Sequence, residues 1–306
     1  MAPFGIGRKW AMVVLAAIVI ILILVLSVGH ENVTSVLDSS FVGNFVLFDS
    51  TEEEVDCEVA AETEINWKTI NVTGLSPEEI VEYFLWTNQT SCKLSHDFGG
   101  RMLKNPSGFD GQKAVCLDPE VAPKAGRCVV YSFGINYDWS FDEAMESYGC
   151  QVFAFDPSMK DIDHDHCKAV KFYNLGLGAK DTSENNGWKL KTLSSIYSML
   201  RPIHGNATID YLKIDIESAE WDAIPNIITT GMLTKVRQLG VEFHWSKRQP
   251  DLQYFHERVN IVKAIEDAGM IRFDSKYNPW YVGHIPALNN YTGSLGYEIA
   301  WFQILP

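Results

Sequence analysis

The sequence of 306 residues lacks the patterns that mark several common classes of protein. It has no C-x-x-C pair, so a zinc site or a thioredoxin-like motif is poorly supported. It has no cluster of Lys and Arg, and its formal net charge is −14. Binding to nucleic acid is therefore not expected, because affinity for a phosphate backbone comes from such clusters. It also has no internal repeat and no low-complexity tract.

Apolar residues, by contrast, are plentiful. They make up 46% of the chain, which suffices for one full α/β core and leaves about a hundred residues for other parts. Residues 10–28 carry no charge and are just long enough to cross a bilayer core of about 30 Å as a helix. The run is longer than the apolar stretch of a typical cleaved signal peptide. A long, cleaved signal peptide is nevertheless the alternative to a retained membrane span. We predict a transmembrane signal anchor.

The flanks of this run predict its orientation. Arg8 and Lys9 come immediately before it, and an excess of basic residues keeps a flank in the cytosol. Residues 1–9 would then be a cytoplasmic tail, and the rest of the chain would face the lumen. We therefore expect a single-pass type II membrane protein of the Golgi or ER, or a secreted protein if the segment is cleaved.

Sequons and cysteines agree with a luminal body. All of them lie beyond the apolar run, as expected of a glycoprotein with disulfide bonds. The N-x-S/T sequons are at Asn32, Asn71, Asn88, Asn206 and Asn290, and the cysteines are Cys57, Cys92, Cys116, Cys128, Cys150 and Cys167. Six cysteines allow fifteen fully paired connectivities, among which the sequence does not choose.

The pattern of the chain changes near residue 111. Residues 29–110 are acidic and show no sustained period except a short helix from Ser76, so we interpret them as a luminal stem and N-terminal extension. In residues 111–306, short apolar runs alternate with helical patterns, which predicts a Rossmann-like α/β domain with a seven-stranded, mostly parallel sheet. The predicted strands are 128–133, 151–155, 171–175, 211–216, 238–243, 271–273 and 296–304, and the helices are 140–148, 193–200, 219–229 and 252–268.

The first strand–helix–strand unit has the features of a cofactor site. One strand ends at Gly134 and the next ends 22 residues later at Asp156, whose carboxylate could accept both hydroxyls of a ribose. The loop lacks the G-x-G-x-x-G pattern that holds a pyrophosphate, and S-adenosylmethionine has no phosphate. We predict S-adenosylmethionine as the cofactor, bound by Gly134, Asn136, Asp156, Pro157 and Asp215. The alternative is an ordinary turn at Gly134, with Asp156 capping the next segment.

Side chains at the ends of the fourth and fifth strands are the candidate catalytic residues. Asp215 shares a strand face with Lys213, either as an ion pair at the sheet end or as a contact to the cofactor's amino group or the substrate. Glu242 and His244 share a face of the next strand, and we predict His244 as the base for a hydroxyl acceptor. A hydrogen-bonded structural histidine is the alternative. Asp215, Glu242 and His244 could also hold a divalent metal ion together, although we predict no metal site.

Four segments carry a resemblance to a known family. DGQKAVCLD, VVYSFGINYDWSFDEAM, GCQVFAFDPSM and YLKIDIESAEWDAI resemble the methyltransferase-like protein 24 group. The stretch from TLSSI to IDYLKIDIESAEW is also similar to FkbM-type methyltransferases, with Ser218 at a glycine of their L-K-I-D-x-E-G-x-E motif. The resemblance implies a class I, S-adenosylmethionine-dependent fold with Gly134, Asp156 and Asp215 near the cofactor. FkbM-type enzymes are associated with O-methylation, often of sugars.

These observations predict an enzyme that O-methylates a luminal or secreted acceptor, such as a glycan or glycoprotein, with S-adenosylmethionine as donor. The main rival is a catalytically inactive methyltransferase-fold binding protein, which the single glycine of the loop would suit. A nucleotide-sugar or NAD enzyme is a third interpretation, and the missing glycine fingerprint argues against it.

Overall fold

The computed structural model describes residues 69–306, apart from residues 89, 105–106, 185–186, 249 and 306. The predicted membrane span, Asn32 and Cys57 lie outside the described residues. Within the part that is described, no helix is both long enough and apolar enough to cross a membrane.

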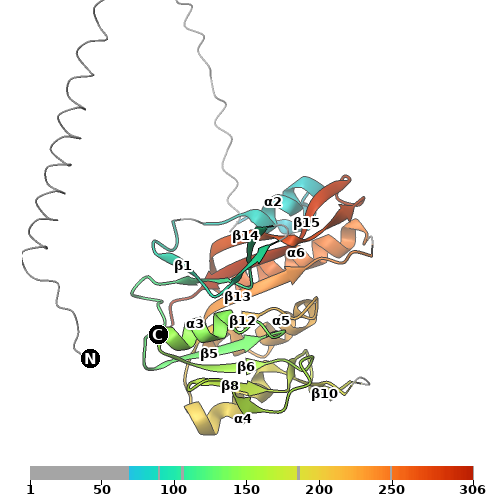
Figure 1. Cartoon of the computed structure of the whole chain (residues 1–306). Coiled ribbons are helices and arrows are strands. Elements are labelled where there is room, and N and C mark those ends of the chain that lie inside the picture. Colours follow the sequence, from blue (N-terminus) through green and yellow to red (C-terminus); the bar gives the residue numbers. More distant parts are fainter. Residues whose placement is uncertain (1–68, 89, 105–106, 185–186, 249, 306) are drawn as a thin grey trace, which may run out of the picture. The chain divides into compact units, whose positions relative to one another are not determined.

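An eight-stranded sheet forms the centre of the domain (Figure 1). Across the sheet the order is β14 (Ile271–Ile285), β15 (Tyr291–Phe302), β13 (Val236–His244), β12 (Ile209–Ile214), β5 (Cys128–Phe133), β6 (Cys150–Phe155), β8 (Val170–Tyr173) and β7 (His164–Asp165). The strands from β13 to β8 are parallel, β15 is antiparallel between β13 and β14, and β7 is antiparallel at the other edge. The seven predicted strands and the mostly parallel sheet are confirmed, and the two-residue β7 is an addition.

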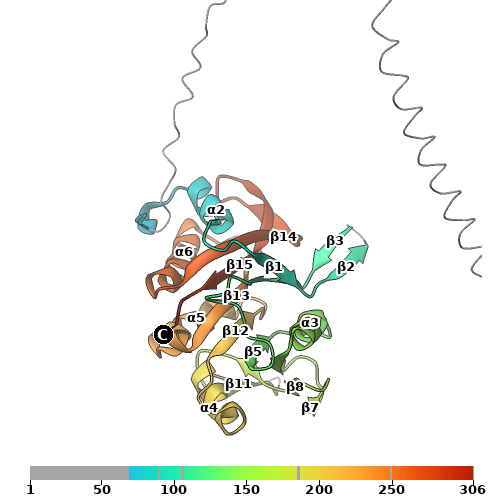
Figure 2. The same cartoon turned by 90° about the vertical axis from the view of Figure 1, so that its left-hand side faces the viewer.

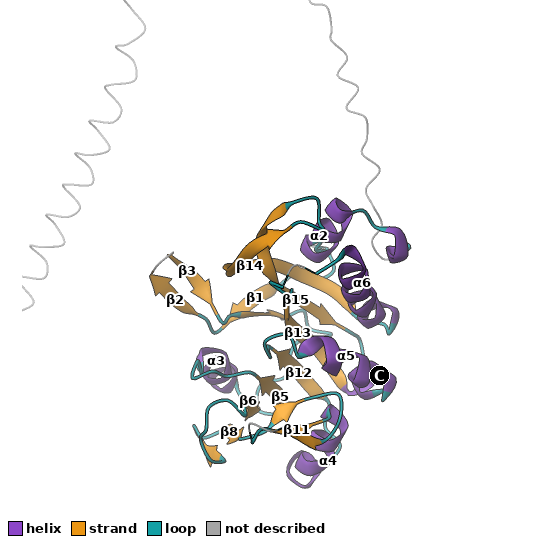
Figure 3. Cartoon of the chain, turned by 90° about the vertical axis from the view of Figure 1, so that its right-hand side faces the viewer, coloured by secondary structure: helices purple, strands orange, loops and turns teal. Residues whose placement is uncertain are grey.

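Helices cover both faces of this sheet, as Figure 3 shows. α4 (Leu193–His204), α5 (Glu220–Thr229) and α6 (Leu252–Asp267) lie on one face, and α3 (Ser140–Tyr148) lies on the other. All four were predicted. Because the middle strands are covered on both sides, every residue of β5 and β12 is buried, which explains why these strands are mostly apolar and do not alternate with exposed polar residues.

The remaining elements, apart from a helix at residues 77–85, are short. They are the 3-10 helices η1 (Val72–Gly74) and η2 (Met232–Lys235), and three small sheets formed by β1 (Ser95–Phe98) with β4 (Lys113–Cys116), by β2 (Arg101–Lys104) with β3 (Ser107–Asp110), and by β10 (Thr182–Ser183), β11 (Lys189–Lys191) and β9 (Gly176–Leu177). The hairpin β2–β3 projects on the side of the sheet where α3 lies (Figures 2 and 3).

Residues before position 111 contribute to the same core as the sheet. The helix predicted from Ser76 is confirmed as α2 (Pro77–Leu85), and it begins with a capping box. The Ser76 hydroxyl accepts from the Glu79 N–H, while the Glu79 carboxylate accepts from the Ser76 N–H. The apolar face of α2 contacts α6, β14 and β15, and it buries Ile80, Tyr83 and Phe84. At least part of the segment interpreted as stem and extension is thus built into the domain.

Two disulfide bonds lie within the described residues. Cys92–Cys116 ties the segment before β1 to β4, and Cys128–Cys150 joins the first residues of β5 and β6, which are paired in the sheet. Cys167 has no disulfide partner among the described residues. The disulfide bonds predicted from the cysteines are thus present at these two pairs.

Replacing Phe84 tests whether α2 is an integral part of the core. Its buried ring makes edge contacts with the rings of Trp221, Phe243 and Trp245. We expect Phe84→Ala to lower the free energy of unfolding in urea by about 3–5 kcal/mol, because it leaves a cavity among these rings. Leu85→Ala, at the exposed neighbouring position, should change it by less than about 1 kcal/mol. Equal effects of the two substitutions would contradict this packing.

Candidate functional site

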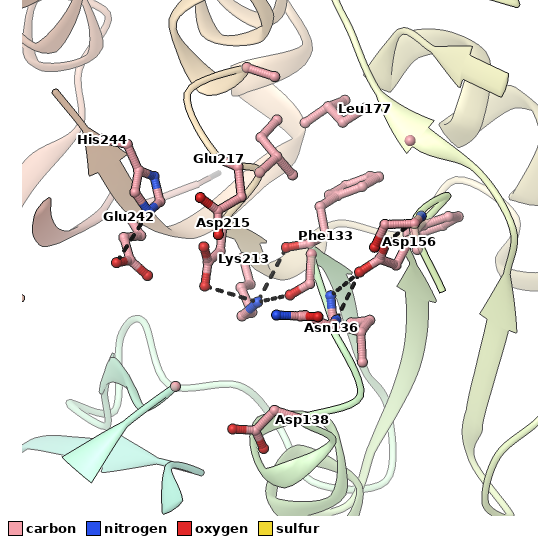
Figure 4. Close-up of a pocket in the computed structure, with 18 of the residues that line it drawn as sticks. Phe133, Asn136, Asp138, Asp156, Leu177, Lys213, Asp215, Glu217, Glu242 and His244 are labelled. Atoms are coloured by element: carbon pink, nitrogen blue, oxygen red, sulfur yellow. Dashed lines mark hydrogen bonds and ion pairs between the residues drawn. The ribbon is translucent and has the colours of Figure 1, made fainter. Parts of the chain in front are cut away.

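A pocket of about 480 Å³ opens where the parallel strands end (Figure 4). It is lined by residues that follow β5, β6 and β12 and by the last residues of β13. Open α/β sheets bind ligands at this edge, next to the point where the strand order reverses. All the residues predicted for the site lie in this one pocket, namely Gly134, Asn136, Asp156, Pro157, Asp215, Glu242 and His244.

Gly134 is required where the loops after β5 and β12 meet. Its φ of 80° lies in the left-handed region, and a Cβ atom on it would be 1.6 Å from the main-chain oxygen of Asp215. Any side chain would therefore push the two loops apart. The glycine permits close approach of protein to protein here, as well as of ligand to protein.

Asp156 holds the loop that follows Gly134. Its Oδ2 accepts hydrogen bonds from the main-chain N–H groups of Ile135 and Asn136 at 2.9 and 2.8 Å. Its Oδ1 accepts from the N–H and the hydroxyl of Ser158 at 2.7 and 2.6 Å. Four donors occupy the acceptor sites that a carboxylate offers. A ribose hydroxyl could bind this carboxylate, as the sequence predicts, only by replacing one of them.

The pocket is apolar next to Asp156. Phe155, Pro157, Leu177 and Leu190 line this part, and the ring of Phe155 stacks on that of Phe133 with 4.6 Å between ring centres. A flat base such as adenine suits an apolar slot of this kind, with polar groups for the ribose and the amino-acid end close by. The residues present thus fit S-adenosylmethionine.

Lys213 links the loops from inside the sheet. Its buried ammonium donates to the carbonyl oxygens of Phe133 and Gly134 at 3.2 and 2.6 Å and lies 3.6 Å from Oδ2 of Asp215 (Figure 4). This geometry agrees with the ion-pair interpretation of Lys213. The Asp215 side chain, by contrast, is 21% exposed and presents its carboxylate to the pocket.

His244 lies between two carboxylates. Its Nδ1 is 3.2 Å from Oε1 of Glu220, and its Nε2 is 3.4 Å from Oε1 of Glu242. Burial lowers the pKa of His244, but these two carboxylates outweigh that effect and raise the pKa to about 11. An imidazolium has no lone pair to accept a proton, so its surroundings argue against the general-base role predicted for His244.

Sequence reasoning missed two charged residues that the fold brings to this end of the pocket. Lys113, in β4, lies 3.3 Å from Asp215, 3.5 Å from Glu242 and 2.5 Å from Glu298 of β15. Burial opposes the ionisation of Glu242, yet the Lys113 ammonium holds its pKa well below the usual range. Burial and the neighbouring carboxylates hold the pKa of Glu298 well above it. A charged residue within each apolar strand was the available signal.

Comparison with known proteins identifies the family. A family described as a methyltransferase domain matches residues 82–287, more than half of the chain. This chain belongs to that family. Over 177 residues it is 27% identical to the human "Probable methyltransferase-like protein 24", covering 55% of this chain and 47% of that protein. The rat protein of the same name is 29% identical over 176 residues, covering 53% and 46%. The chain thus spans about half the length of these relatives.

The predicted family is therefore confirmed. Membership in a methyltransferase family supports the predicted enzyme and its S-adenosylmethionine donor, and it does not favour the inactive binding protein. A solved structure of an S-adenosylmethionine-dependent methyltransferase from Agrobacterium tumefaciens is 13% identical, with a TM-score of 0.33, and covers 60% of this chain and 57% of its own.

Two turns of the methyltransferase pocket have an unusual backbone. Asn136 and Tyr137 in the loop after β5, and Glu217 and Ser218 in the loop after β12, all have φ between 45° and 81°. The backbone of a residue other than glycine is strained in this region of φ. At Ser218 the FkbM-type motif has glycine, and the φ of 81° explains why glycine suits that position.

Ser218→Gly should relieve this strain. We expect the free energy of unfolding to rise by about 1 kcal/mol, because glycine adopts positive φ without steric cost. Ser198→Gly, at an exposed position within α4, should lower it by about 0.5–1 kcal/mol. Urea denaturation of both variants measures the two changes in the free energy of unfolding, which should have opposite signs. A lower stability of Ser218→Gly would contradict the presence of backbone strain at Ser218.

Asp142 on α3 is a buried acid beside the pocket. Neither of its carboxylate oxygens has a hydrogen-bond partner among the described residues, although Ser132 and Lys213 lie nearby. Burial raises the pKa of Asp142 to about 6, and Lys213 limits the rise. Since the folded state holds this proton more tightly than the unfolded state does, the acid costs stability as the pH rises from about 4 through 6.

Asp142→Asn should remove that cost. We expect the variant to be more stable than the wild type by about 1–3 kcal/mol at pH 8, with a smaller gain at pH 4.5 where the wild-type acid is protonated. Denaturation at both pH values measures the difference. Asp165→Asn, at the surface, controls for the change in net charge. A gain for Asp142→Asn that does not depend on pH would contradict the assignment.

Proposed function

We propose that this methyltransferase transfers the methyl group of S-adenosylmethionine to a hydroxyl oxygen. The proposal rests on one pocket that combines a cofactor-shaped slot around Gly134 and Asp156 with a partly exposed carboxylate, Asp215, beside it. Bound S-adenosylmethionine supplies an electrophilic methyl group on sulfur. As the C–O bond forms, the C–S bond breaks and the hydroxyl loses its proton, so the protein must position the acceptor and receive that proton.

Asp215 is the group best placed to receive the proton. The Glu242 side chain is only 7% exposed, and its Oε1 already accepts from the Asn278 amide at 2.6 Å. His244 is protonated at neutral pH. Asp215 faces the pocket, and the ammonium groups of Lys113 and Lys213 hold its carboxylate in position.

The far end of the pocket suits a carbohydrate acceptor. Trp280 and Tyr281 line it together with the carboxylate of Asp110. The Trp280 ring lies against Gly108, where a Cβ atom would be 2.9 Å away, and its N–H donates to the Phe109 carbonyl at 3.3 Å. Sugars offer hydroxyls to carboxylates and C–H faces to aromatic rings. The many carboxylates disfavour an anionic acceptor.

Such an acceptor would be met in the secretory pathway. The sequons at Asn71, Asn206 and Asn290 are exposed, and two disulfides stabilise the domain. Together with the apolar run at residues 10–28, these features support a single-pass type II protein of the Golgi or ER whose domain faces the lumen, or a secreted form.

The experiment measures cofactor binding by calorimetry and transfer of labelled methyl groups to luminal glycoproteins. We expect Asp156→Ala to weaken S-adenosylmethionine binding at least about tenfold, because the loop after Gly134 loses two hydrogen bonds and Ser158 loses two. We expect Asp215→Asn to keep binding and to lower the transfer rate about 10²–10³-fold.

Asp118→Ala is the matched control for the binding arm. Asp118 also accepts two main-chain N–H bonds, from Lys93 and Leu94, but it does not line the pocket. Absence of S-adenosylmethionine binding by the wild type would refute the proposal as a whole. If the wild type binds S-adenosylmethionine but transfers no labelled methyl group to any glycan fraction, only the proposal of a carbohydrate acceptor is refuted.

A further inference from the structure

The side chain of Lys113 is enclosed by acidic groups at the acceptor end of the pocket. It is 1% exposed, and its Nζ lies 2.5 Å from Oε1 of Glu298, 3.3 Å from Oδ2 of Asp215 and 3.5 Å from Oε2 of Glu242. An ammonium group has three donors and no acceptor, and here three carboxyl groups surround it. Lys113 is therefore the internal cation of this cluster.

The same cluster has the form of a metal site. Asp215, Glu242 and His244 each offer a ligand atom, and these atoms lie within 4.8 Å of one another. Carboxylates and neutral imidazole suit divalent ions such as Mn²⁺, so His244 would have to release its proton to bind one. The Lys113 ammonium, however, already lies against two of the three ligands. A divalent ion bound there would be next to a buried positive charge, which repels it strongly in a site shielded from water.

The strand that carries Lys113 is held firmly. The Gln238 side chain, from β13, accepts from the Cys116 N–H and donates to the Cys116 carbonyl oxygen, both at 2.8 Å. Cys116 is also bonded to Cys92, and β4 pairs with β1 along its whole length. These contacts fix the position of β4 against the sheet, so the ammonium is placed in advance of any ligand.

We propose that Lys113 is a positioning residue that replaces a divalent metal, so that methyl transfer in this protein needs no metal ion. Its ammonium holds Asp215 and Glu242 in the geometry that a bound cation would otherwise impose. Removing it should leave a vacant, acidic, partly preformed site that binds a divalent cation. The catalytic part of this inference rests on the proposed function, whereas the metal-binding part does not.

The test is a Mn²⁺ titration of the full chain followed by electron paramagnetic resonance. We expect the wild type to bind no Mn²⁺ at concentrations up to about 1 mM. Lys113→Met should bind one ion with a Kd at least about tenfold below that concentration. Lys213→Met is the matched control, because Lys213 is equally buried but contacts Asp215 alone among the three ligands. It should bind none.

Methyl transfer gives a second readout. We expect EDTA to leave the wild-type rate of methyl transfer unchanged. Lys113→Met should lower this rate at least about 100-fold, and added Mn²⁺ should raise the rate of the variant at least about tenfold. A merely structural lysine would show no rescue by metal. A thermal unfolding scan shows whether Lys113→Met is folded, and Lys113→Gln replaces it if it is not.

Mn²⁺ binding to the wild type would overturn the proposal, and so would a folded Lys113 variant that binds no Mn²⁺. Loss of wild-type activity in EDTA would also overturn it. If no variant and no wild-type sample transfers a methyl group, the proposed function fails, while selective Mn²⁺ binding by Lys113→Met would still support Lys113 as the internal cation.

Discussion

The close contact between Gly134 and Asp215 is the constraint on which the rest of the site depends. The main-chain oxygen of Asp215 occupies the space that a side chain at position 134 would need. Lys213 bonds the carbonyl oxygens on one side of this contact and pairs with the Asp215 carboxylate on the other. The two loops therefore form one rigid unit, which places the cofactor slot and the acceptor end at a fixed separation.

The acidity of the acceptor end follows from this arrangement and creates an electrostatic problem. Asp215, Glu242 and Glu298 come from neighbouring strands and would repel one another if all were ionised out of contact with water. Lys113 and the protonated His244 offset that repulsion, and burial together with the neighbouring carboxylates raises the pKa of Glu298. The result is a polar cluster in which the Asp215 side chain is the most exposed, at 21%.

Where local signals were strong, the fold could be predicted closely. α3 and β5 have the predicted bounds, and Ser76, as the N-cap residue, marked the start of α2. β14 was predicted as 271–273 but extends to Ile285, because register shifts between Arg272 and Asp274 and between Asn278 and Val282 interrupt the alternation that marks a strand. The short β7 gave no pattern, since two residues are too few to show a period.

For the site, the sequence by itself determined the residues at the ends of consecutive strands. Gly134, Asp156, Asp215, Glu242 and His244 could be placed together because parallel strands bring their carboxyl ends to one edge.

Only the tertiary structure decided their electrostatics. Lys113 and Glu298 reach the cluster from β4 and from the antiparallel β15, which lie 185 positions apart in the chain. The charge of His244, the four donors on Asp156 and the burial of Asp142 depend on such distant neighbours, since a side chain's protonation and partners are set by what surrounds it in space.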